Sequence, residues 1–587
     1  MITILIAWAS LFAAACGCAF AQNQELRKAN WVFGDSIWLK FNENHPTVNT
    51  FPAANFGEVF SSISDTNGNL LITFKGDNYH FQQNGVNHFV KNNGKILDMN
   101  GDVIANGEGI NHHTSGANGF VFLPFPGANN KYIFIALSSK CDTCSPPYAD
   151  SDALYLTEIE LSGTNFVVNH KNEIYWNRRM SEAMGVYSHS NGKDFWLTTH
   201  SMHRDTFFTF LINQNGIFGP EAQTIGSIYL PWDLNQTTMN YINKMSINAQ
   251  KSKLVTVSYE GIIDVFRINR CTGKILKPQF LGTPYPSFSP GSPPSIPSTD
   301  AFYGCLFSPN GSKLYVSTLS FNNALLFQFD LETEDISGSK FQIPFGTQPL
   351  GFGTPQMQLG LDKKIYLIPN VFANGLSHDI CGNYAESLVN VLAVIHSPDS
   401  SEFACEFETN YLHIGRCVGC GLPNFPAYAP PLYVSPAGAD TSVCPNLPAL
   451  LGKANDADTS IYHPIFEWVP CAGLSCCDCE RPLAFPEQTT QYTLRVVVEG
   501  GCEFFDSVTV AVENVVLPML NDTSVCQGKS FVMPRGSGIY HWSPAVTETE
   551  SSYIFTPLET ATYTLSYSET GNCYAVDSFR ITVIPRY

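Results

Sequence analysis

The chain has 587 residues and a formal net charge of −19 at pH 7, and 14% of its residues are charged. Because single hydrophobic cores stop growing at about 250 to 300 residues, this length predicts several domains. Nucleic-acid binding draws its affinity from clustered Lys and Arg, so an acidic chain with few basic residues argues against a nucleic-acid partner.

Residues 1–21 have the composition of an export signal. An apolar run from Ile4 to Ala15 is followed by Ala19-Phe20-Ala21, which resembles the small-residue cleavage site of a secretory signal peptide. No Lys or Arg precedes the run, and acylation at Cys16 or Cys18 is the alternative, although neither cysteine follows a Leu at the usual place. No later stretch reaches the ~18 to 20 apolar residues of a spanning helix. We therefore expect a protein that is secreted or held at the outer cell surface, without a transmembrane segment.

Between Trp31 and Phe425 one phrase recurs, a polar turn followed by a short apolar strand, as in Asp65-Thr-Asn-Gly-Asn-Leu-Leu-Ile-Thr-Phe74. Six copies are visible, with equivalent positions 51 to 63 residues apart at Leu71, Ile133, Trp196, Val255, Tyr315 and Tyr366. A regular period of several short strands is typical of propeller blades, whereas unrelated β-sandwiches would not repeat one phrase at this spacing. The sequence predicts an all-β chain with a six- or seven-bladed β-propeller over 22–425, in which a strand near Trp31 closes the seventh blade.

Beyond a Pro- and Ala-rich segment at 426–439, which has the composition of an extended linker, one domain is repeated. Asp440-Thr-Ser-Val-Cys444 recurs word for word as Asp522-Thr-Ser-Val-Cys526, and a later Trp, Tyr and Cys recur in the same order. The repeat predicts two tandem Ig-like or PKD-like β-sandwiches, over 440–515 and 516–587.

Each repeat places a Trp between an early and a late cysteine. Cysteines and a Trp in this order face one core in Ig-type domains, which predicts the disulfides Cys444–Cys502 and Cys526–Cys573. Export to an oxidising compartment favours such bridges.

The wording of the chain also resembles a family. Asn30-Trp-Val-Phe-Gly34, His189-Ser-Asn-Gly-Lys-Asp-Phe-Trp-Leu-Thr-Thr-His200 and Gly421-Leu-Pro-Asn-Phe425 are similar to segments of large secreted or surface proteins of Bacteroidetes. Those proteins carry a WD40-like or YVTN-like propeller, PKD or Ig-like repeats, and commonly a sorting domain for type IX secretion or gliding motility. The resemblance implies an architecture and an export route, but no activity. After Ile584 only Pro-Arg-Tyr587 remains, which leaves no evident C-terminal sorting domain.

The first repeat contains a cysteine-rich insertion that the second lacks, Cys471-Ala-Gly-Leu-Ser-Cys-Cys-Asp-Cys479. Cys476 and Cys479 have the C-x-x-C spacing of zinc ligands. Export, the even number of cysteines and the resemblance to family repeats with a paired C-x-D-C segment favour disulfides instead, and we expect Cys476–Cys479 and Cys471–Cys477.

Two further short loops, Cys141-Asp-Thr-Cys144 and Cys417-Val-Gly-Cys420, have the spacing of redox dithiols. Neither lies in a βαβ context, so we expect structural bridges in both.

His189, His200 and His203 cluster around the third copy of the blade phrase. His200-x-x-His203 lacks the helix and the Glu of a zinc-protease motif, and residues i and i+3 of a strand point to opposite faces. We expect hydrogen-bonded structural histidines. No catalytic or cofactor-binding motif is found. Calcium is compatible with so acidic a chain, although the stretch that begins at Asp65 has Leu70 at the sixth position, where a calcium loop has Gly, and no Glu at the last position.

These features favour a non-catalytic binding or adhesion protein, whose propeller faces an extracellular protein or glycan and whose sandwiches act as spacers. One alternative is a propeller hydrolase or lyase that acts on an extracellular glycan, and another is a structural stalk or matrix component. Two or more buried carboxylates in the central funnel, or a His with an acidic partner there, would favour the enzyme.

Overall fold

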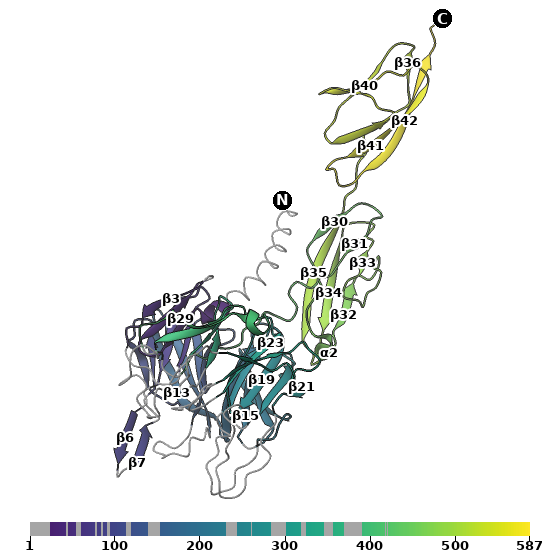
Figure 1. Ribbon diagram of the computed structural model, residues 1–587. Coiled ribbons are helices and arrows are strands. Elements are labelled where there is room, and N and C mark those ends of the chain that lie inside the picture. Colours follow the sequence, from purple (N-terminus) through teal and green to yellow (C-terminus); the bar gives the residue numbers. More distant parts are fainter. Residues whose placement is uncertain are drawn as a thin grey trace. The chain divides into compact units, whose positions relative to one another are not determined.

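The computed structural model describes residues 24–586 except 43–44, 54–59, 77–78, 84–85, 91–93, 113–118, 139–152, 203, 230–242, 260, 283–300, 319–324, 345–355, 369–389, 417 and 419–420. The described chain is almost entirely β (Figure 1). Its only helical elements are short: η1 (Leu26–Lys28), η2 (Glu402–Cys405) and α2 (Thr459–Tyr462). No described helix is long and apolar enough to cross a bilayer.

Seven antiparallel groups of strands, one per blade, follow each other along the first part of the described chain. We call them sheets 1 to 7, and sheets 2 and 3 are joined into one eight-stranded sheet. Sheet 1 has three strands: β1 (Asn30–Phe33), β2 (Ile37–Phe41) and β3 (Pro46–Thr50). Sheets 2 and 3 comprise β4 (Phe60–Ser64), β5 (Leu70–Lys75), β8 (Gly94–Asp98) and β9 (Val103–Ile110), then β10 (Phe120–Pro124), β11 (Lys131–Ser138), β12 (Ala153–Ser162) and β13 (Asn165–Trp176). Their outer strands β9 and β13 meet in parallel, and the hairpin of β6 (Tyr79–Gln83) and β7 (Val86–Val90) is inserted after β5.

The remaining four sheets have four strands each. Sheet 4 comprises β14 (Met180–Ser188), β15 (Phe195–Ser201), β16 (Thr206–Asn213) and β17 (Gly216–Thr224), and sheet 5 comprises β18 (Asn243–Asn248), β19 (Lys253–Ser258), β20 (Ile263–Ile268) and β21 (Ile275–Phe280). Sheet 6 comprises β22 (Phe302–Phe307), β23 (Lys313–Thr318), β24 (Leu326–Asp330) and β25 (Phe341–Ile343), and sheet 7 comprises β26 (Met357–Leu359), β27 (Ile365–Leu367), β28 (Val391–Ile395) and β29 (Phe407–His413).

The seven sheets form a closed ring whose centre is lined by the first strand of each blade. First strands of successive sheets contact one another, as in β1 with β4, β4 with β10, β14 with β18, β18 with β22, and β22 with β26. Sheets 3 and 4 share a core that joins Leu123 to Val186. The ring closes where Trp31 and Phe41 of sheet 1 pack against Tyr366 of sheet 7, with ring centroids 5.8 Å and 5.5 Å from it. The predicted propeller is confirmed.

The recurring phrase is the hairpin between the first and second strands of a blade. In sheet 2 the Asp65 carboxylate accepts the N–H groups of Asn67 and Asn69 at 2.8 Å, and Gly68 between them has φ 80°. An Asx turn of this kind closes a tight hairpin, and glycine adopts the left-handed conformation at little steric cost. The apolar residues that follow form the second strands β5, β11, β15, β19, β23 and β27, which are largely buried.

Residues 422–432, which we call the crossing segment, pair with the propeller, although residues 426–432 belong to the predicted linker. They bond in turn to the first strands of sheets 7, 2, 3 and 4. The Leu422 N–H donates to Gln356 Oε1 at 3.1 Å, and the Asn424 N–H and Nδ2 donate to the carbonyls of Phe60 and Phe120, each at 3.1 Å. A segment that contacts the innermost strands of four blades lies in the centre of the ring.

The crossing segment then runs alongside β14. Ala427 forms a parallel β-bridge with Tyr187, in which its N–H donates to the Val186 carbonyl at 2.7 Å and its carbonyl accepts the Ser188 N–H at 3.1 Å. Tyr428 is buried beside them. The part of the predicted linker up to residue 432 therefore belongs to the propeller, because its backbone groups pair with the free edge of an inner strand.

Two β-sandwiches follow. The first contains β30 (Thr441–Val443), β31 (Ala449–Leu450), β32 (Ile465–Val469), β33 (Leu483–Ala484), β34 (Thr490–Val497) and β35 (Glu503–Val512). The second contains β36 (Thr523–Cys526), β37 (Phe531–Pro534), β38 (Ile539–Ser543), β39 (Thr547–Glu548), β40 (Ser552–Phe555), β41 (Ala561–Ser568) and β42 (Ala575–Ile584). Their main sheets have the same order, β30-β35-β34-β32 and β36-β42-β41-β38, which confirms the tandem repeat.

By contacts, residues 16–432 and 457–462 make up one compact unit, and residues 433–456 and 463–587 fall in the other. Residues 457–462 thus group with the propeller although they lie within the region predicted as the first sandwich. The Tyr462 hydroxyl lies 2.7 Å from Ser252 Oγ, and the Ile461 carbonyl accepts a hydrogen bond from Asn269.

Candidate functional site

His200 lies in sheet 4, His189 lies in the turn between two strands of that sheet, and His203 lies outside the described residues. His200 is buried in β15, where Nδ1 is 2.7 Å from the Ser201 carbonyl and the ring packs edge-on against Tyr229 at 4.2 Å. Burial lowers the pKa of His200 to about 3, although the bond to Ser201 opposes the shift. The ring is therefore neutral at physiological pH.

His189 lies in the turn between β14 and β15. Its Nδ1 accepts the Asn191 N–H at 3.1 Å, so Nε2 carries the proton that is donated to the Cys271 carbonyl at 3.1 Å. Burial lowers the pKa of His189 in spite of the nearby Asp194. Both histidines are hydrogen-bonded within the blades. The hydrogen bonds described for their rings lead to backbone groups, and none of them leads to a carboxylate.

Tyr229, beside His200, belongs to a buried polar cluster that spans sheets 4 and 5. Asp264 of β20 accepts hydrogen bonds from the Ser227 N–H at 2.7 Å and the Ser227 hydroxyl at 2.9 Å, and burial raises the pKa of its carboxyl. Asn243 Oδ1 accepts the Ala183 N–H at 2.8 Å. The Tyr229 hydroxyl and Asn243 Nδ2 are buried without an aligned hydrogen-bond partner among the described residues.

A second buried carboxylate, Glu182, is 2% exposed on the inner strand β14. Asp264 and Glu182 meet the number of buried carboxylates that we expect of a propeller enzyme. However, each oxygen of Asp264 already accepts a hydrogen bond from Ser227, and no bonded pair of His and carboxylate is found in the described interior of the propeller. Among the described residues, no group of three or more His, Cys, Asp or Glu is placed to hold a metal ion.

Lys244 is a buried residue of an inner strand that sequence reasoning missed. It lies on β18, is 7% exposed, and its pKa is lowered to about 8 by burial. The Cys305 thiol of the neighbouring inner strand β22 donates to the Lys244 carbonyl at 3.7 Å, and burial raises the pKa of this thiol to about 12. A buried amine of this kind is reactive when deprotonated. The sequence signal for it is weak, because β18 contains only two apolar residues, Met245 and Ile247.

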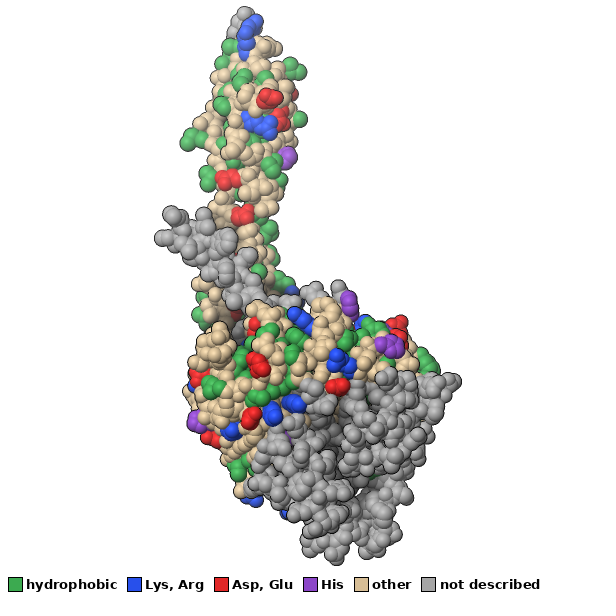
Figure 2. All heavy atoms as spheres, turned by 90° about the vertical axis from the view of Figure 1, so that its left-hand side faces the viewer, with side chains coloured by type: hydrophobic (Ala, Val, Ile, Leu, Met, Phe, Trp, Pro, Cys, Tyr) green, Lys and Arg blue, Asp and Glu red, His purple; other side chains and the backbone are tan. Residues whose placement is uncertain are grey.

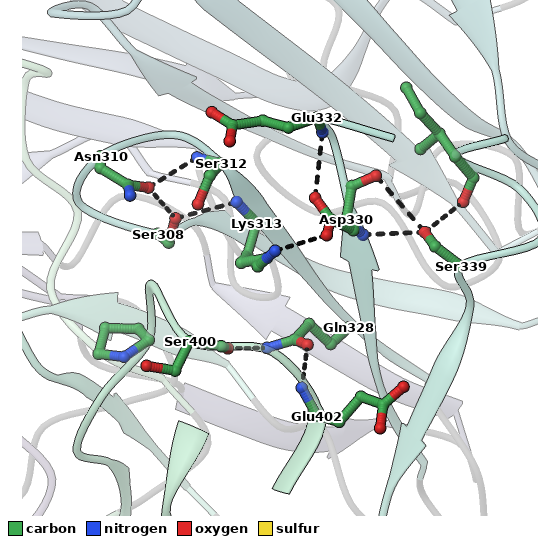
Figure 3. Close-up of polar contacts among 12 residues, drawn as sticks. Ser308, Asn310, Ser312, Lys313, Gln328, Asp330, Glu332, Ser339, Ser400 and Glu402 are labelled. Carbon is green, nitrogen blue, oxygen red and sulfur yellow. Dashed lines mark hydrogen bonds and ion pairs between the residues drawn. The ribbon is translucent and has the colours of Figure 1, made fainter. Parts of the chain in front are cut away.

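Sheet 6 carries a network of polar contacts (Figure 3). Lys313 Nζ lies 2.7 Å from Asp330 Oδ2, across the strand pair of β23 and β24. Burial of Asp330 is outweighed by the hydrogen bonds from Lys313 and the Glu332 N–H, which lower the pKa of this carboxyl. Lys313 itself belongs to the recurring phrase, so the ion pair links the first hairpin of the blade to its third strand.

The lower part of Figure 3 shows how sheet 6 is joined to sheet 7. Gln328 Nε2 donates to the Ser400 carbonyl at 2.8 Å and to the Tyr315 hydroxyl at 2.7 Å, and Gln328 Oε1 accepts the Glu402 N–H at 2.7 Å. Every polar atom of this amide is used. These hydrogen bonds hold the two adjacent blades together.

The expected pairing of the early and late cysteines is wrong. Cys444 of the first repeat is bonded to Cys573 of the second, with Cα atoms 5.4 Å apart. Cys502 is bonded to another cysteine, and the exposed Cys526 is a free thiol. The Ig-type pattern predicts a bridge across each core, but here the early cysteine follows the end of its strand, so the bond joins consecutive domains instead of spanning one.

The insertion of the first repeat contains the two expected disulfides, Cys471–Cys477 and Cys476–Cys479. The Trp468 indole of β32 donates to the Cys479 carbonyl at 3.0 Å, which ties the insertion to the sandwich. The expected bridges Cys141–Cys144 and Cys417–Cys420 lie outside the described residues and stay predictions.

No family model matches the chain, and no curated protein matches it in sequence. Among solved structures, a candidate 6-phosphogluconolactonase from Bacteroides fragilis is 12% identical with a TM-score of 0.38, and the match covers 67% of this chain and 97% of that chain. A second, from Bacteroides uniformis, is 9% identical with a TM-score of 0.37, over 67% and 99% of the two chains. The insect immune protein hemolin is 13% identical with a TM-score of 0.16, over 26% and 46%. Because all three TM-scores lie below 0.5, the fold assignment rests on the strand pairings of this chain.

Proposed function

We propose that this chain is an exported binding or adhesion protein, in which the propeller presents a surface to an extracellular protein or glycan and the two sandwiches act as spacers. The proposal includes export by the N-terminal signal and the organisation of Bacteroidetes surface proteins that the sequence resembles. It assigns no catalytic residue.

The observation that carries this proposal is the position of the crossing segment. The centre of the ring, where a propeller enzyme would bind a substrate against the inner strands, is occupied by residues 422–432 of the same chain. The edge of β14 there is paired with Ala427. An occupied centre favours recognition on the outer faces and loops, where binding residues on rigid scaffolds concentrate.

The disulfides support the same proposal. They persist in oxidising, extracellular surroundings, and the bond from Cys444 to Cys573 joins two consecutive domains. A covalent link of this kind suits a spacer that is exposed to proteases and to pulling forces. The rival function, glycan cleavage, is favoured by the burial of Glu182 and Asp264 alone.

The test is a glycan array and a pull-down of surface proteins with residues 22–587, followed by cross-linking to locate the bound face. We expect a ligand whose cross-links fall on outer loops of the propeller. Cross-links confined to 440–587 would contradict the propeller as the binding face. Turnover of an array glycan that is lost in both Glu182→Gln and Asp264→Asn, while binding is kept, would replace the proposal with the enzyme.

Figure 2 shows one face of the molecule on which acidic, basic and hydrophobic side chains are interspersed over the described surface. A mixed surface gives no single class of ligand on charge alone. Both arms of the test, glycan and protein, are therefore needed.

A further inference from the structure

Cys444 and Cys526 occupy the same structural position in the two repeats. Each follows or ends the first strand of its sandwich, and that strand pairs in parallel with the last one, β30 with β35 and β36 with β42. The turn after each cysteine is closed by the same hydrogen bond, from the N–H of Leu447 to the Cys444 carbonyl at 3.1 Å and from the N–H of Lys529 to the Cys526 carbonyl at 2.9 Å. In both turns the residue immediately before the N–H donor has a positive φ.

The capping of the last strand is repeated as well. Asp440 Oδ1 accepts the Thr509 N–H at 2.7 Å, and Asp522 Oδ1 accepts the Arg580 N–H at 2.8 Å. Each carboxylate lies four residues before its cysteine. The two cysteines are thus presented by the same local structure, and what one of them does in the first repeat is a direct guide to the other.

The two cysteines differ in their partners. Cys444 is bonded to Cys573, which lies in the turn before the last strand of the following domain and is 3% exposed. The corresponding late cysteine of the first repeat, Cys502, is also disulfide-bonded. Only Cys526 among the described cysteines of the repeats is a free thiol, and it is exposed.

We propose that Cys526 is a site of covalent attachment, which forms a disulfide with a further β-sandwich module of this repeat through that module's unpaired cysteine at the position of Cys573. The bond would reproduce the one from Cys444 to Cys573. When this disulfide forms, the two cysteine thiols together lose two protons and two electrons. A disulfide oxidant such as oxidised glutathione takes up these protons and electrons and is reduced to two molecules of thiol.

The partner is a module of this type, and not any thiol, because of where the bonded cysteine lies. Cys444 of the first repeat is bonded to a cysteine of the turn that precedes a last strand, and that cysteine, Cys573, is buried. The other two free cysteines that are described, Cys305 and Cys405, are buried in the propeller and cannot serve as partners.

The test supplies such a module. A second copy of residues 514–587 is appended to residues 22–587, and the chain is oxidised with reduced and oxidised glutathione. We expect peptide mapping to find Cys526 bonded to the Cys573 of the appended copy. The native thiol titre should then equal that of the unextended chain, because the copied Cys526 replaces the original as the free thiol. A titre higher by two thiols, with an appended copy that is protected from hydrogen exchange, overturns the proposal.

A second measurement does not depend on folding of the appended copy. The unextended chain is treated with oxidised glutathione, and we expect one glutathione at Cys526, with none at this position in Cys526→Ser. Protection of Cys526 from this reagent would show that the thiol cannot be reached, and the proposal fails. The proposal also fails if, in the extended chain, the two Cys526 residues bond to each other and Cys526 does not bond to Cys573 of the appended copy.

Discussion

Replacing Ala427 by proline distinguishes a crossing segment from a linker. Proline lacks an N–H, so Ala427→Pro removes the hydrogen bond to the Val186 carbonyl, which is 2.7 Å long in the parallel bridge with β14. Val186 is 4% exposed, so its carbonyl would be left buried without this partner. Removing one partner of a buried hydrogen bond leaves the other unsatisfied, at a cost of about 1 to 3 kcal/mol. We therefore expect Ala427→Pro to destabilise the propeller by about 1 to 3 kcal/mol.

The assay is urea unfolding of residues 22–587, followed by tryptophan fluorescence, with the midpoint of the propeller transition as the readout. The matched control is Ala427→Gly, which keeps the N–H and should cost only about 0.5 to 1 kcal/mol, through backbone entropy. A flexible linker would accept proline at this position, next to Pro426, without loss. Equal midpoints for Ala427→Pro and Ala427→Gly would refute the placement of the segment inside the ring.

Three further predictions follow from the ion pair, the disulfide and the buried histidine. Hydrogen bonds lower the folded-state pKa of Asp330, so its interaction with Lys313 contributes stability above the unfolded pKa of about 3.9. This stability is lost as the pH falls through the folded-state pKa. Lys313→Met and Asp330→Asn should therefore both flatten the pH dependence of the unfolding midpoint below about pH 4. A protease cut between residues 513 and 521 should leave two fragments that separate only on reduction, whereas in Cys444→Ser they should separate at once; separation without reductant in the parent chain would contradict the bond to Cys573. His200 has a folded-state pKa of about 3, below its unfolded value of about 6.5, so the unfolded state binds the proton first and stability should decline as the pH falls from about 6.5. His200→Leu should remove this part of the decline, and an imidazole signal that titrates near pH 6.5 in the folded chain would show that the residue is not buried as described.

The repeated phrases predict the blade hairpins correctly because a hairpin depends on interactions between residues that are close in the sequence. A polar Asx turn followed by alternating or continuous apolar residues forms a hairpin wherever it occurs, so the copies at Leu71 through Tyr366 mark second strands of blades. The strand near Trp31 belongs to a seventh sheet, which packs against Tyr366. The structural role of His200 is predictable for a similar reason, since a His inside a buried strand is itself buried and neutral.

The interpretation of residues 426–439 as a linker was wrong for its first half, because composition does not record what lies beside a chain. Pro426 and Pro430 favour an extended backbone, and an extended backbone suits a free linker and the centre of a ring equally well. Tyr428 is the signal in the sequence, since linkers rarely carry large apolar side chains that need burial. Lys244 was missed for a similar reason, because a single Lys in a strand does not reveal that the strand lines the ring.

By itself the sequence determined the all-β class, the repetition of blades, the tandem sandwiches and the short-range disulfides of the insertion, because each depends on residues a few positions apart. Only the tertiary structure decided which distant groups meet: Ala427 with β14, Trp31 with Tyr366, and Cys444 with Cys573. These contacts depend on how whole domains and blades are placed, and equally spaced cysteines are compatible with a bond within a domain or between domains. Cys526 is free because Cys573 is bonded to Cys444 of the preceding domain, which leaves the early cysteine of the second repeat without a partner.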